Sequence, residues 1–429
     1  MAANHSPRFR LLKRPTGARF LACFVLVVAA ANTAEAQEAE KQTPALTENE
    51  VVARALRRAP LTELLEGAAV AEEGRGRAAS AYPNPEFSYL REQTFGAFGT
   101  REDYVAVSQT IDLGNRRGLR EEAGHARARS ARREGDAARM VVAVDARQRF
   151  YEVLYRQARV PALEGWTARI DRALTIVTRR EQRGDAATYD RRRLERERAV
   201  ATGRLATERA ALEGAQARLR AILGEAAQVP SLTGTLLPEA EPAALPTLRA
   251  SSASRPDLLA LELRIEAGSL DRTAASRWWL PDLRLEGGWK GVDLGRQGRT
   301  DGFLLGAALS IPLWDRSSGL ARVAEGEERV AQGRRALLES ELAGELGGAR
   351  AEAVRLRRAA AEFREQTTSA SGDLVRIASA GYEGGELGLV ELLDAYRGAA
   401  DDAVTTLDME HSARRARIEL DRLIGAGPR

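Results

Sequence analysis

Hydrophobic and polar residues follow one another along this chain with two different periods. The first has apolar residues three and four positions apart, the spacing of one helix face. It is clear in 389–407 and less clean in 201–222. The composition of long helices, rich in Ala, Arg, Glu and Leu, extends over 115–160 with its continuation to 183, then 188–223, 316–381 and 389–424. A helix of about 65 residues is about 100 Å long, so it must pack laterally on neighbours to be stable. The last stretch has a heptad seam, which favours coiled-coil packing, at Leu389, Leu393, Tyr396, Ala400, Ala403 and Leu407.

The second period is two, with polar and apolar residues in alternation over short segments. It is clear in 282–292 and 301–311 and noisier in 84–94 and 102–112. This alternation predicts β-strands, and about 10 residues is the length of a tilted transmembrane strand. Any one segment also fits a soluble hairpin. Four of them between very long helices favour strands that span a membrane.

Aromatic residues flank the predicted strands. Tyr82 precedes the first strand, Trp278 and Trp279 precede the third, and Trp314 follows the fourth. Aromatic rings are enriched where a membrane meets water. We therefore predict these four residues as membrane-interface aromatics, with an isolated core aromatic as the alternative for each.

The sequence repeats itself at an interval of about 200 residues. Pro85 and Pro281 precede matching strands 196 positions apart, and Ile111–Arg116 matches Ile311–Arg316 at an offset of 200. Each half reads as helix, strand, strand, long helix, turn and helix. We expect a first repeat at 37–225, a Pro-rich linker at 226–256 and a second repeat at 257–429.

The first 36 residues have the pattern of an export signal. A basic segment without acidic residues precedes the apolar run 20–31, and Ala34-Glu35-Ala36 provides a cleavage site. The apolar run is about 12 residues, too short to cross a bilayer. The chain's single cysteine, Cys23, lies inside this run and lacks the apolar stretch that should precede a lipidation site. We therefore expect an exported chain without a lipid anchor.

The remaining chain has no marked charge and few strong metal ligands. The formal net charge is +4, but removal of 1–36 leaves equal numbers of basic and acidic residues, which argues against nucleic-acid binding. The histidines and methionines left are His125, His411, Met140 and Met409. No pair of them has metal-ligand spacing, and no nucleophile, acid–base pair or phosphate loop is recognisable. We predict no catalytic site, no metal site and no cofactor.

Four membrane strands are too few to close a barrel. An open sheet in lipid exposes backbone groups at its edges, at a cost of several kcal/mol for each unpaired group. Association with other copies is therefore required. Three copies give twelve strands, an even number within the known range for membrane barrels.

Three motifs resemble the TolC-type outer-membrane efflux proteins: Pro83-Asn84-Pro85-Glu86-Phe87, the segment Ser310–Arg316 and the segment Gly381–Ala395. The run Pro-Leu-Trp-Asp-Arg-Ser-Ser-Gly at 312–319 further resembles the cobalt-zinc-cadmium branch of that family, which serves heavy-metal pumps of the resistance-nodulation-division class. The resemblance extends over essentially the whole chain after residue 36. It implies a mainly α homotrimer, with a coiled-coil barrel in the periplasm and a twelve-stranded β-barrel in outer-membrane lipid.

The resemblance also implies a role and a gate. The trimer would be a passive conduit for heavy-metal cations, working with a periplasmic adaptor and an inner-membrane pump. Glu391 and Asp394 match acidic residues that ring the periplasmic constriction, and Tyr382 and Asp190 match a tyrosine and its partner that link the inner helices to their neighbours. Leu387 stands where well-known members have an arginine, which puts one closing salt bridge in doubt.

Other functions remain open at this point. Drug efflux and type I protein secretion use the same class of channel, and the sequence of the channel separates them poorly. A periplasmic adaptor also combines long helices with β structure. An adaptor, however, has one central helical hairpin with β domains on both flanks, whereas here a pair of strands interrupts each half.

Overall fold

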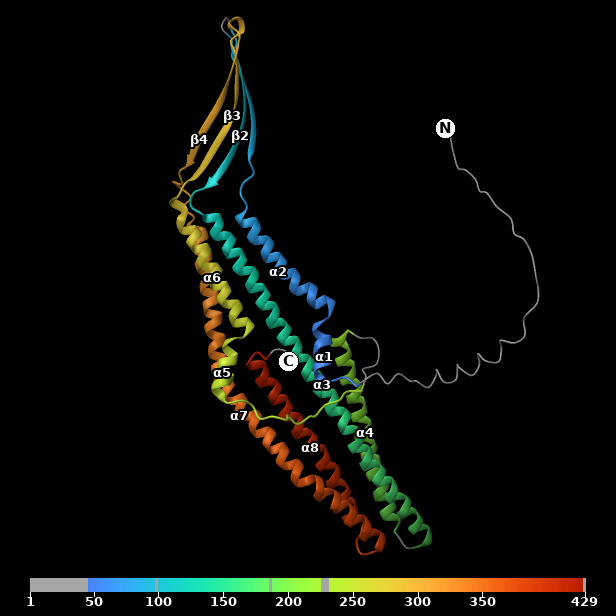
Figure 1. The fold of residues 1–429 in the computed structure, drawn as a ribbon. Coiled ribbons are helices and arrows are strands. Elements are labelled where there is room, and N and C mark those ends of the chain that lie inside the picture. Colours follow the sequence, from blue (N-terminus) through green and yellow to red (C-terminus); the bar gives the residue numbers. More distant parts are fainter. Residues whose placement is uncertain (1–44, 97–98, 185–186, 225–230, 427–429) are drawn as a thin grey trace, which may run out of the picture. The chain divides into compact units, whose positions relative to one another are not determined.

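The computed structural model describes residues 45–96, 99–184, 187–224 and 231–426. Residues Leu46–Arg429 form one compact unit, and the architecture below is that of its described residues. The predicted export signal at 1–36 lies outside the described residues. The chain is mainly helical with one four-stranded sheet, as the two periodicities predicted (Figure 1).

Two very long helices dominate the fold, and each turns back into a shorter one. Helix α3 (Arg116–Arg183) is followed by α4 (Thr188–Leu223), and α7 (Ser318–Gly384) is followed by α8 (Leu389–Leu423). Each long helix ends at a glycine in the left-handed conformation, Gly184 with φ 84° and Gly385 with φ 79°. Glycine adopts this conformation without a Cβ clash and so ends a helix at little cost.

The remaining helices flank these two hairpins. They are α1 (Glu48–Leu56), α2 (Ala59–Ser80), α5 (Leu245–Ala253) and α6 (Pro256–Ser276), with the 3₁₀ turns η1 (Arg277–Trp279) and η2 (Gly295–Gln297). Helices α2, α3, α6 and α7 lie side by side in that order (Figure 1). Helix α5 falls within the predicted linker 226–256, so the described part of this linker is partly helical.

All four strands pair antiparallel in the order β1-β2-β3-β4. Their bounds are β1 (Glu86–Gln93), β2 (Arg101–Asp112), β3 (Asp282–Asp293) and β4 (Arg299–Ser310). Strand β2 lies beside β3, with Val107 opposite Gly287, so the central pairing joins the two repeats. Strands β1 and β4 are the edges, and each has one side without a partner strand among the described residues.

The two repeats have the same order of elements. The first is α2-β1-β2-α3-α4 and the second is α6-β3-β4-α7-α8. The residue before each long helix is in the left-handed conformation, Asn115 with φ 47° and Ser317 with φ 51°. Few non-glycine residues adopt this conformation, so the chain makes the same unusual turn from sheet to helix in both halves.

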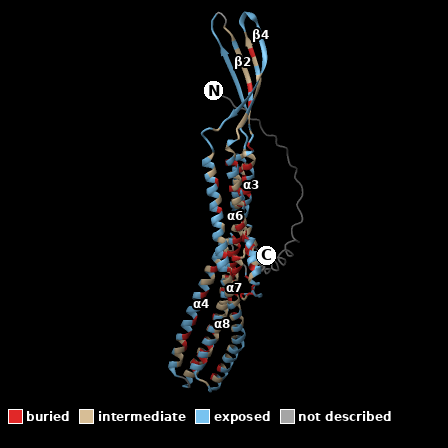
Figure 2. Cartoon of the chain, turned by 90° about the vertical axis from the view of Figure 1, so that its left-hand side faces the viewer, coloured by how far each residue is buried: buried red, intermediate tan, exposed pale blue. Residues whose placement is uncertain are grey.

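The apolar core is divided between the middle and the hairpin end of the helices. One cluster joins α1, α3 and α4 around Phe150 and Leu219. A second joins the two hairpins around Trp166, Ile170 and Leu393. Buried positions lie mainly along the helices, whereas β1 and β4 are almost wholly exposed and β2 and β3 are mostly half-buried (Figure 2). The sheet therefore has no core of its own within one chain.

Arginines hold the described part of the linker against α7 and α8. Arg414, Arg357 and Arg350 donate hydrogen bonds to backbone carbonyls between residues 235 and 243, at 2.7–3.1 Å. Arg414 also lies over the ring of Tyr151, with its guanidinium carbon 4.4 Å from the ring centroid. These bonds satisfy carbonyls of a segment that lacks secondary structure of its own.

Between the sheet and the middle of the helices, α2 and α3 are close because two glycines face each other. A Cβ on Gly76 would lie 2.7 Å from the Cα of Gly124, whereas a Cβ on Gly67 of the same helix would meet open space. We predict that Gly76→Ala forces the helices apart and lowers the free energy of unfolding by about 1–3 kcal/mol. Urea unfolding followed by circular dichroism measures this change.

The control is Gly67→Ala, which should be neutral or raise the free energy of unfolding by up to about 1 kcal/mol through helix propensity alone. If both variants behave alike, the close approach of α2 and α3 at Gly76 is contradicted.

Candidate functional site

One face of the sheet is apolar over most of its length. Antiparallel pairing places odd-numbered residues opposite one another, so they share this face. Its large apolar side chains are Phe87, Tyr89, Val105, Val107, Ile111, Leu283, Leu285, Trp289, Phe303, Leu305 and Leu309. Phe303 is 84% exposed and Phe87 71%. A continuous exposed apolar face of this size indicates contact with lipid or with another protein.

The even-numbered residues make the opposite face polar. Lys290 pairs with Glu102 at 2.6 Å, and the Lys290 ammonium lies 4.8 Å from the ring centroid of Tyr104. Arg284 pairs with Glu86 on the same face. A sheet with one apolar and one charged face is typical of strands that separate lipid from a water-filled interior.

The side chains of two aromatic residues on the apolar face, Tyr89 and Trp289, point towards the turns between the strands. The Tyr89 hydroxyl donates a hydrogen bond to Oδ1 of Asp103 at 2.8 Å. The indole ring of Trp289 lies over Gly291, and the Arg299 guanidinium carbon is 5.3 Å from its centroid. Both rings thus have an apolar body towards the middle of the strands and a polar contact towards the turns, as aromatic residues at a membrane interface do. Neither residue was predicted as an interface aromatic, although both lie in the alternating segments.

The four aromatics predicted from the sequence lie at the other ends of the strands, next to the helices. The guanidinium carbon of Arg117 is 5.3 Å from the ring centroid of Tyr82, and that of Arg316 is 5.6 Å from the ring centroid of Trp278. Trp279 is 62% and Trp314 91% exposed. The positions fit a second interfacial belt, which stays a prediction.

At the tip of the α7–α8 hairpin, Tyr382 lies against Arg180 of the other hairpin. The guanidinium carbon of Arg180 is 5.1 Å from the ring centroid, and its nitrogens donate to the carbonyls of Tyr382 and Glu383 at 3.3 and 3.0 Å. Burial raises the pKa of Tyr382; the Arg180 cation opposes this rise, and the nearby charge of Asp190 adds to it. Tyr382 and Asp190 are thus neighbours, with Arg180 as the tyrosine's direct partner.

Leu387 occupies the place where the resemblance implied an arginine. Its side chain packs on Gly381, where a Cβ would approach Cδ1 of Leu387 to 2.7 Å. The backbone N–H of Leu387 donates to the carbonyl of Gly381 at 3.0 Å, which closes the turn. At this position an apolar contact within one hairpin replaces a charged side chain.

Glu391 and Asp394 are exposed on α8, three residues apart. They lie on the side of the helix away from the buried Leu392 and Leu393. Among the described residues, neither carboxylate makes an ion pair or hydrogen bond. The structure therefore leaves both free to face an opening or a partner, and it does not bring them to Tyr382.

Ion pairs connect the two hairpins above the tip. The Nε of Arg397 on α8 donates to Oε1 of Glu197 on α4 at 2.6 Å, and Glu197 is only 4% exposed. The Arg397 guanidinium lowers the pKa of Glu197 against the opposing effect of burial. A second pair, Arg204 with Asp401 at 3.3 Å, is well exposed.

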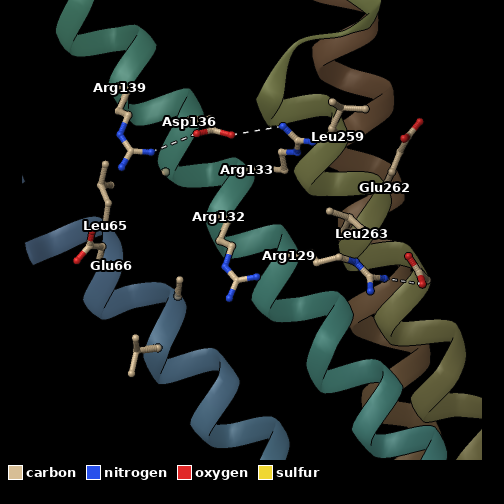
Figure 3. A pocket seen from close by; sticks show the side chains of 14 residues that line it. Leu65, Glu66, Arg129, Arg132, Arg133, Asp136, Arg139, Leu259, Glu262 and Leu263 are labelled. Atoms are coloured by element: carbon tan, nitrogen blue, oxygen red, sulfur yellow. Dashed lines mark hydrogen bonds and ion pairs between the residues drawn. The ribbon is translucent and has the colours of Figure 1, made fainter. Parts of the chain in front are cut away.

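A cavity of about 950 Å³ lies between α2, α3 and α6 (Figure 3). Arg129, Arg132, Arg133 and Arg139 of α3 line it. These cations are matched by acidic partners: Arg129 pairs with Glu266 at 2.9 Å, and Asp136 lies 3.4 and 3.2 Å from Arg133 and Arg139. Because the lining has as many carboxylates as guanidiniums, the cavity favours neither anions nor cations.

Within the described ranges, no group of three or more histidine, cysteine or acidic side chains is arranged to hold a metal ion. The helices described by the structure include none that is long and apolar enough to cross a bilayer.

Known proteins resemble this chain in sequence and in fold. Residues 247–426, which include α6, the β3–β4 hairpin and the α7–α8 hairpin, match the family model described as outer membrane efflux protein. The second half of the chain is thus similar in sequence to this family of outer membrane efflux proteins. A curated relative, the cobalt-zinc-cadmium resistance protein CzcC of Cupriavidus metallidurans, is 28% identical over 385 residues, which are 82% of this chain and 84% of the relative.

Solved structures have the same fold over nearly the whole chain. A membrane protein from Pseudomonas aeruginosa has a TM-score of 0.71 at 20% identity, covering 89% of this chain and 90% of that one. The Neisseria gonorrhoeae MtrE outer membrane channel in its open state has a TM-score of 0.70 at 16% identity, covering 89% of both chains. The chain thus has the fold of these outer-membrane channels, and its second half matches a family of outer membrane efflux proteins.

We predict that Arg397→Ala leaves the nearly buried Glu197 carboxylate without its partner and lowers the free energy of unfolding by about 1–3 kcal/mol at neutral pH. The folded pKa of Glu197 lies below its ordinary value of 4.5. The ion pair therefore makes its full contribution to the free energy of unfolding above pH 4.5. Its contribution is lost as the pH falls through the folded pKa. Urea unfolding at neutral and acidic pH measures both effects.

The control is Arg204→Ala, which breaks the exposed pair with Asp401 and should cost less than about 1 kcal/mol. Equal losses in the two variants, or a loss in Arg397→Ala that is unchanged at acidic pH, would contradict this role of the Arg397–Glu197 pair.

Proposed function

We propose that this protein assembles as a homotrimer and forms the outer-membrane conduit of a tripartite efflux system for heavy-metal cations. The main observation in favour of a trimer is the open amphipathic sheet. Its edge strands β1 and β4 have unpaired sides among the described residues, and its odd-numbered face is apolar and exposed. In lipid, such edges are tolerated only when other strands pair with them. Three copies would close a twelve-stranded barrel with lipid outside and the charged face inside.

The helices have a complementary unpartnered face. On α7, Leu320, Val323, Val330 and Leu337 are 53–74% exposed and follow a spacing of three and seven residues. On α2, the outermost helix on the other side, Leu64 is 68% exposed. In a ring of identical copies, α7 of one copy would lie against α2 of the next, in a repeated head-to-tail contact.

The chain itself supplies no energy source, so transport needs partners. A conduit of this kind receives its substrate from an inner-membrane pump of the resistance-nodulation-division class through a periplasmic adaptor. The hairpin tips are the ends far from the sheet, where Tyr382, Asp190 and Arg180 connect the two hairpins. An adaptor that binds the separated hairpins better than the joined ones would open the conduit.

Two observations favour cations as the substrate. The relative CzcC is named for cobalt-zinc-cadmium resistance. In addition, Glu391 and Asp394 are exposed and unpaired among the described residues, so three copies would place six carboxylates around a narrow opening. Such a ring attracts cations and repels anions. The described interior offers no group of three strong ligands that would retain a metal ion on its way out.

We predict that a charge on the exposed α7 stripe prevents assembly. Val330→Glu combined with Leu337→Glu would place carboxylates in an apolar contact between copies. Light scattering of the detergent-purified protein should then give the mass of a monomer in place of a trimer. Gln332→Glu, which adds the same charge on the opposite side of α7, should leave the trimer intact. A trimer that survives the double substitution would contradict the proposed contact.

We further predict that Glu391→Ala with Asp394→Ala weakens the block of single-channel current by Zn²⁺ or Co²⁺ at least tenfold, because the cations lose their carboxylates. Planar-bilayer recordings measure the block. Asp401→Ala removes an exposed acid two turns further along α8 and should leave the block unchanged. Unchanged block in the double variant would remove both residues from the gate, and with them the support that the gate gives to a cation substrate.

A further inference from the structure

Beyond the aromatic residues Tyr89 and Trp289, the apolar face of the sheet becomes charged. The next two cross-strand rows towards the turns hold Arg91, Asp103 and Asp301, then Arg101, Asp293 and Arg299. These six residues, here called the charged belt, all have odd numbers and so share the face of the apolar rows. In the four odd-numbered rows nearer the helices, 105 to 111 on β2, no charged residue occurs.

In the three ion pairs of the belt the arginine is accessible to water, although Asp103, which also accepts a hydrogen bond from Tyr89, is only 15% exposed. Arg91 pairs with Asp103 at 2.6 Å, Arg101 with Asp293 at 3.5 Å, and Arg299 with Asp301 at 3.3 Å. The three arginine side chains are 44–54% exposed. Exposed pairs of this kind contribute little to stability, because water competes with the partner and the long side chains lose freedom. The guanidiniums can therefore exchange a carboxylate for another anion at small cost.

The belt lies where a bilayer ends. The strands leave the helices at Glu86, Asp112, Asp282 and Ser310, so the turns between the strands are at the ends far from the helices (Figure 1). Because the helices of the proposed conduit extend into the periplasm, these turns are on the outer side of the membrane. Tyr89 and Trp289 direct their polar contacts to this side. The belt is thus at the depth of the headgroups of the outer leaflet.

We propose that the charged belt binds phosphate-bearing lipid headgroups of the outer leaflet, with Arg91, Arg101 and Arg299 as the phosphate ligands. Arginine presents a planar fork of N–H donors that matches phosphate oxygens in pairs. The acyl chains of the same lipid would lie on the apolar rows between Trp289 and Ile111. This inference rests on the proposed function, since it requires the apolar face to be turned to lipid.

The test uses the purified full-length trimer in a zwitterionic detergent, titrated with phosphatidic acid and with phosphatidylcholine of the same chain length. Native mass spectrometry gives the apparent dissociation constants of the bound lipid. Phosphatidic acid should bind at least tenfold more tightly than phosphatidylcholine. In the variant R91Q/R101Q/R299Q this preference should fall at least tenfold, because basic residues at a membrane surface act additively on anionic lipid.

Matched variants separate this role from others. R284Q removes an arginine of similar exposure from the opposite face, where it pairs with Glu86, and should leave the preference intact. R91K/R101K/R299K keeps the positive charges and should retain most of the preference for phosphatidic acid. Inorganic phosphate at the concentration of the lipid should not displace phosphatidic acid, because it lacks the chains that contact the apolar rows.

The inference is overturned if the glutamine variant, still trimeric by mass, keeps the full preference, or if R284Q loses as much of it. It is also overturned if phosphate alone displaces the lipid. In those cases the proposed conduit stands, because trimer mass and channel current are measured independently. If the glutamine variant does not assemble, R91Q alone, which should lose about threefold of the preference, decides the question.

Discussion

Backbone hydrogen bonding at the two sheet edges is the constraint on which the rest of the structure depends. Strands β1 and β4 each present a row of N–H and C=O groups with no partner strand among the described residues. In water such an edge is tolerable, but beside an apolar face turned to lipid each unpaired group costs several kcal/mol. The helices thus pack around clusters within one chain, whereas the sheet edges have no partner strand among the described residues, and in the proposed trimer other copies would provide it.

The helices likewise have surfaces that pack within one chain and apolar surfaces that remain exposed. The cluster around Trp166 and Leu393 and the ion pair of Arg397 with the buried Glu197 join two hairpins of the same chain. In contrast, Val330 and Leu337 on α7 stay 53% and 74% exposed in the described chain, with Val330 at the edge of an open cavity beside α2, α3 and α6. The residues that pack within one chain and the exposed apolar residues proposed to contact another copy thus lie on different sides of the same helices. Assembly can follow folding without rearranging the core.

Much of this architecture could be predicted from the sequence because both periodicities are long. The heptad seam and the long helix-favouring stretches predicted α3, α4, α7 and α8 to within a few residues, with α3 continuing through Pro161, and the alternation found all four strands. Helix α5 was hidden inside a proline-rich linker, because Pro246 stands within its first turn, where proline is well tolerated. The matched motifs of the two halves also predicted the duplication.

The details of the candidate site were harder to predict from the sequence, because they depend on the orientation of individual side chains. Alternation shows that Tyr89 and Trp289 lie on the apolar face, but their lean towards the turns arises from Asp103 and Arg299 on neighbouring strands. Similarly, the spacing of Tyr382 and Asp190 could not reveal Arg180, which comes from the end of the other hairpin. Contacts between segments about 200 residues apart are set by the packing of the helices, which no local pattern encodes.

Cross-linking of the edge strands tests the central claim most directly. The single cysteine, Cys23, is in the predicted export signal, so Ser88→Cys on β1 can be combined with one cysteine at a time at the even positions 300 to 308 of β4. If neighbouring copies complete the sheet, at least one pair should oxidise in outer membranes to covalent dimers and trimers on denaturing gels. Monomers at every position, in membranes that contain the protein, would contradict the account.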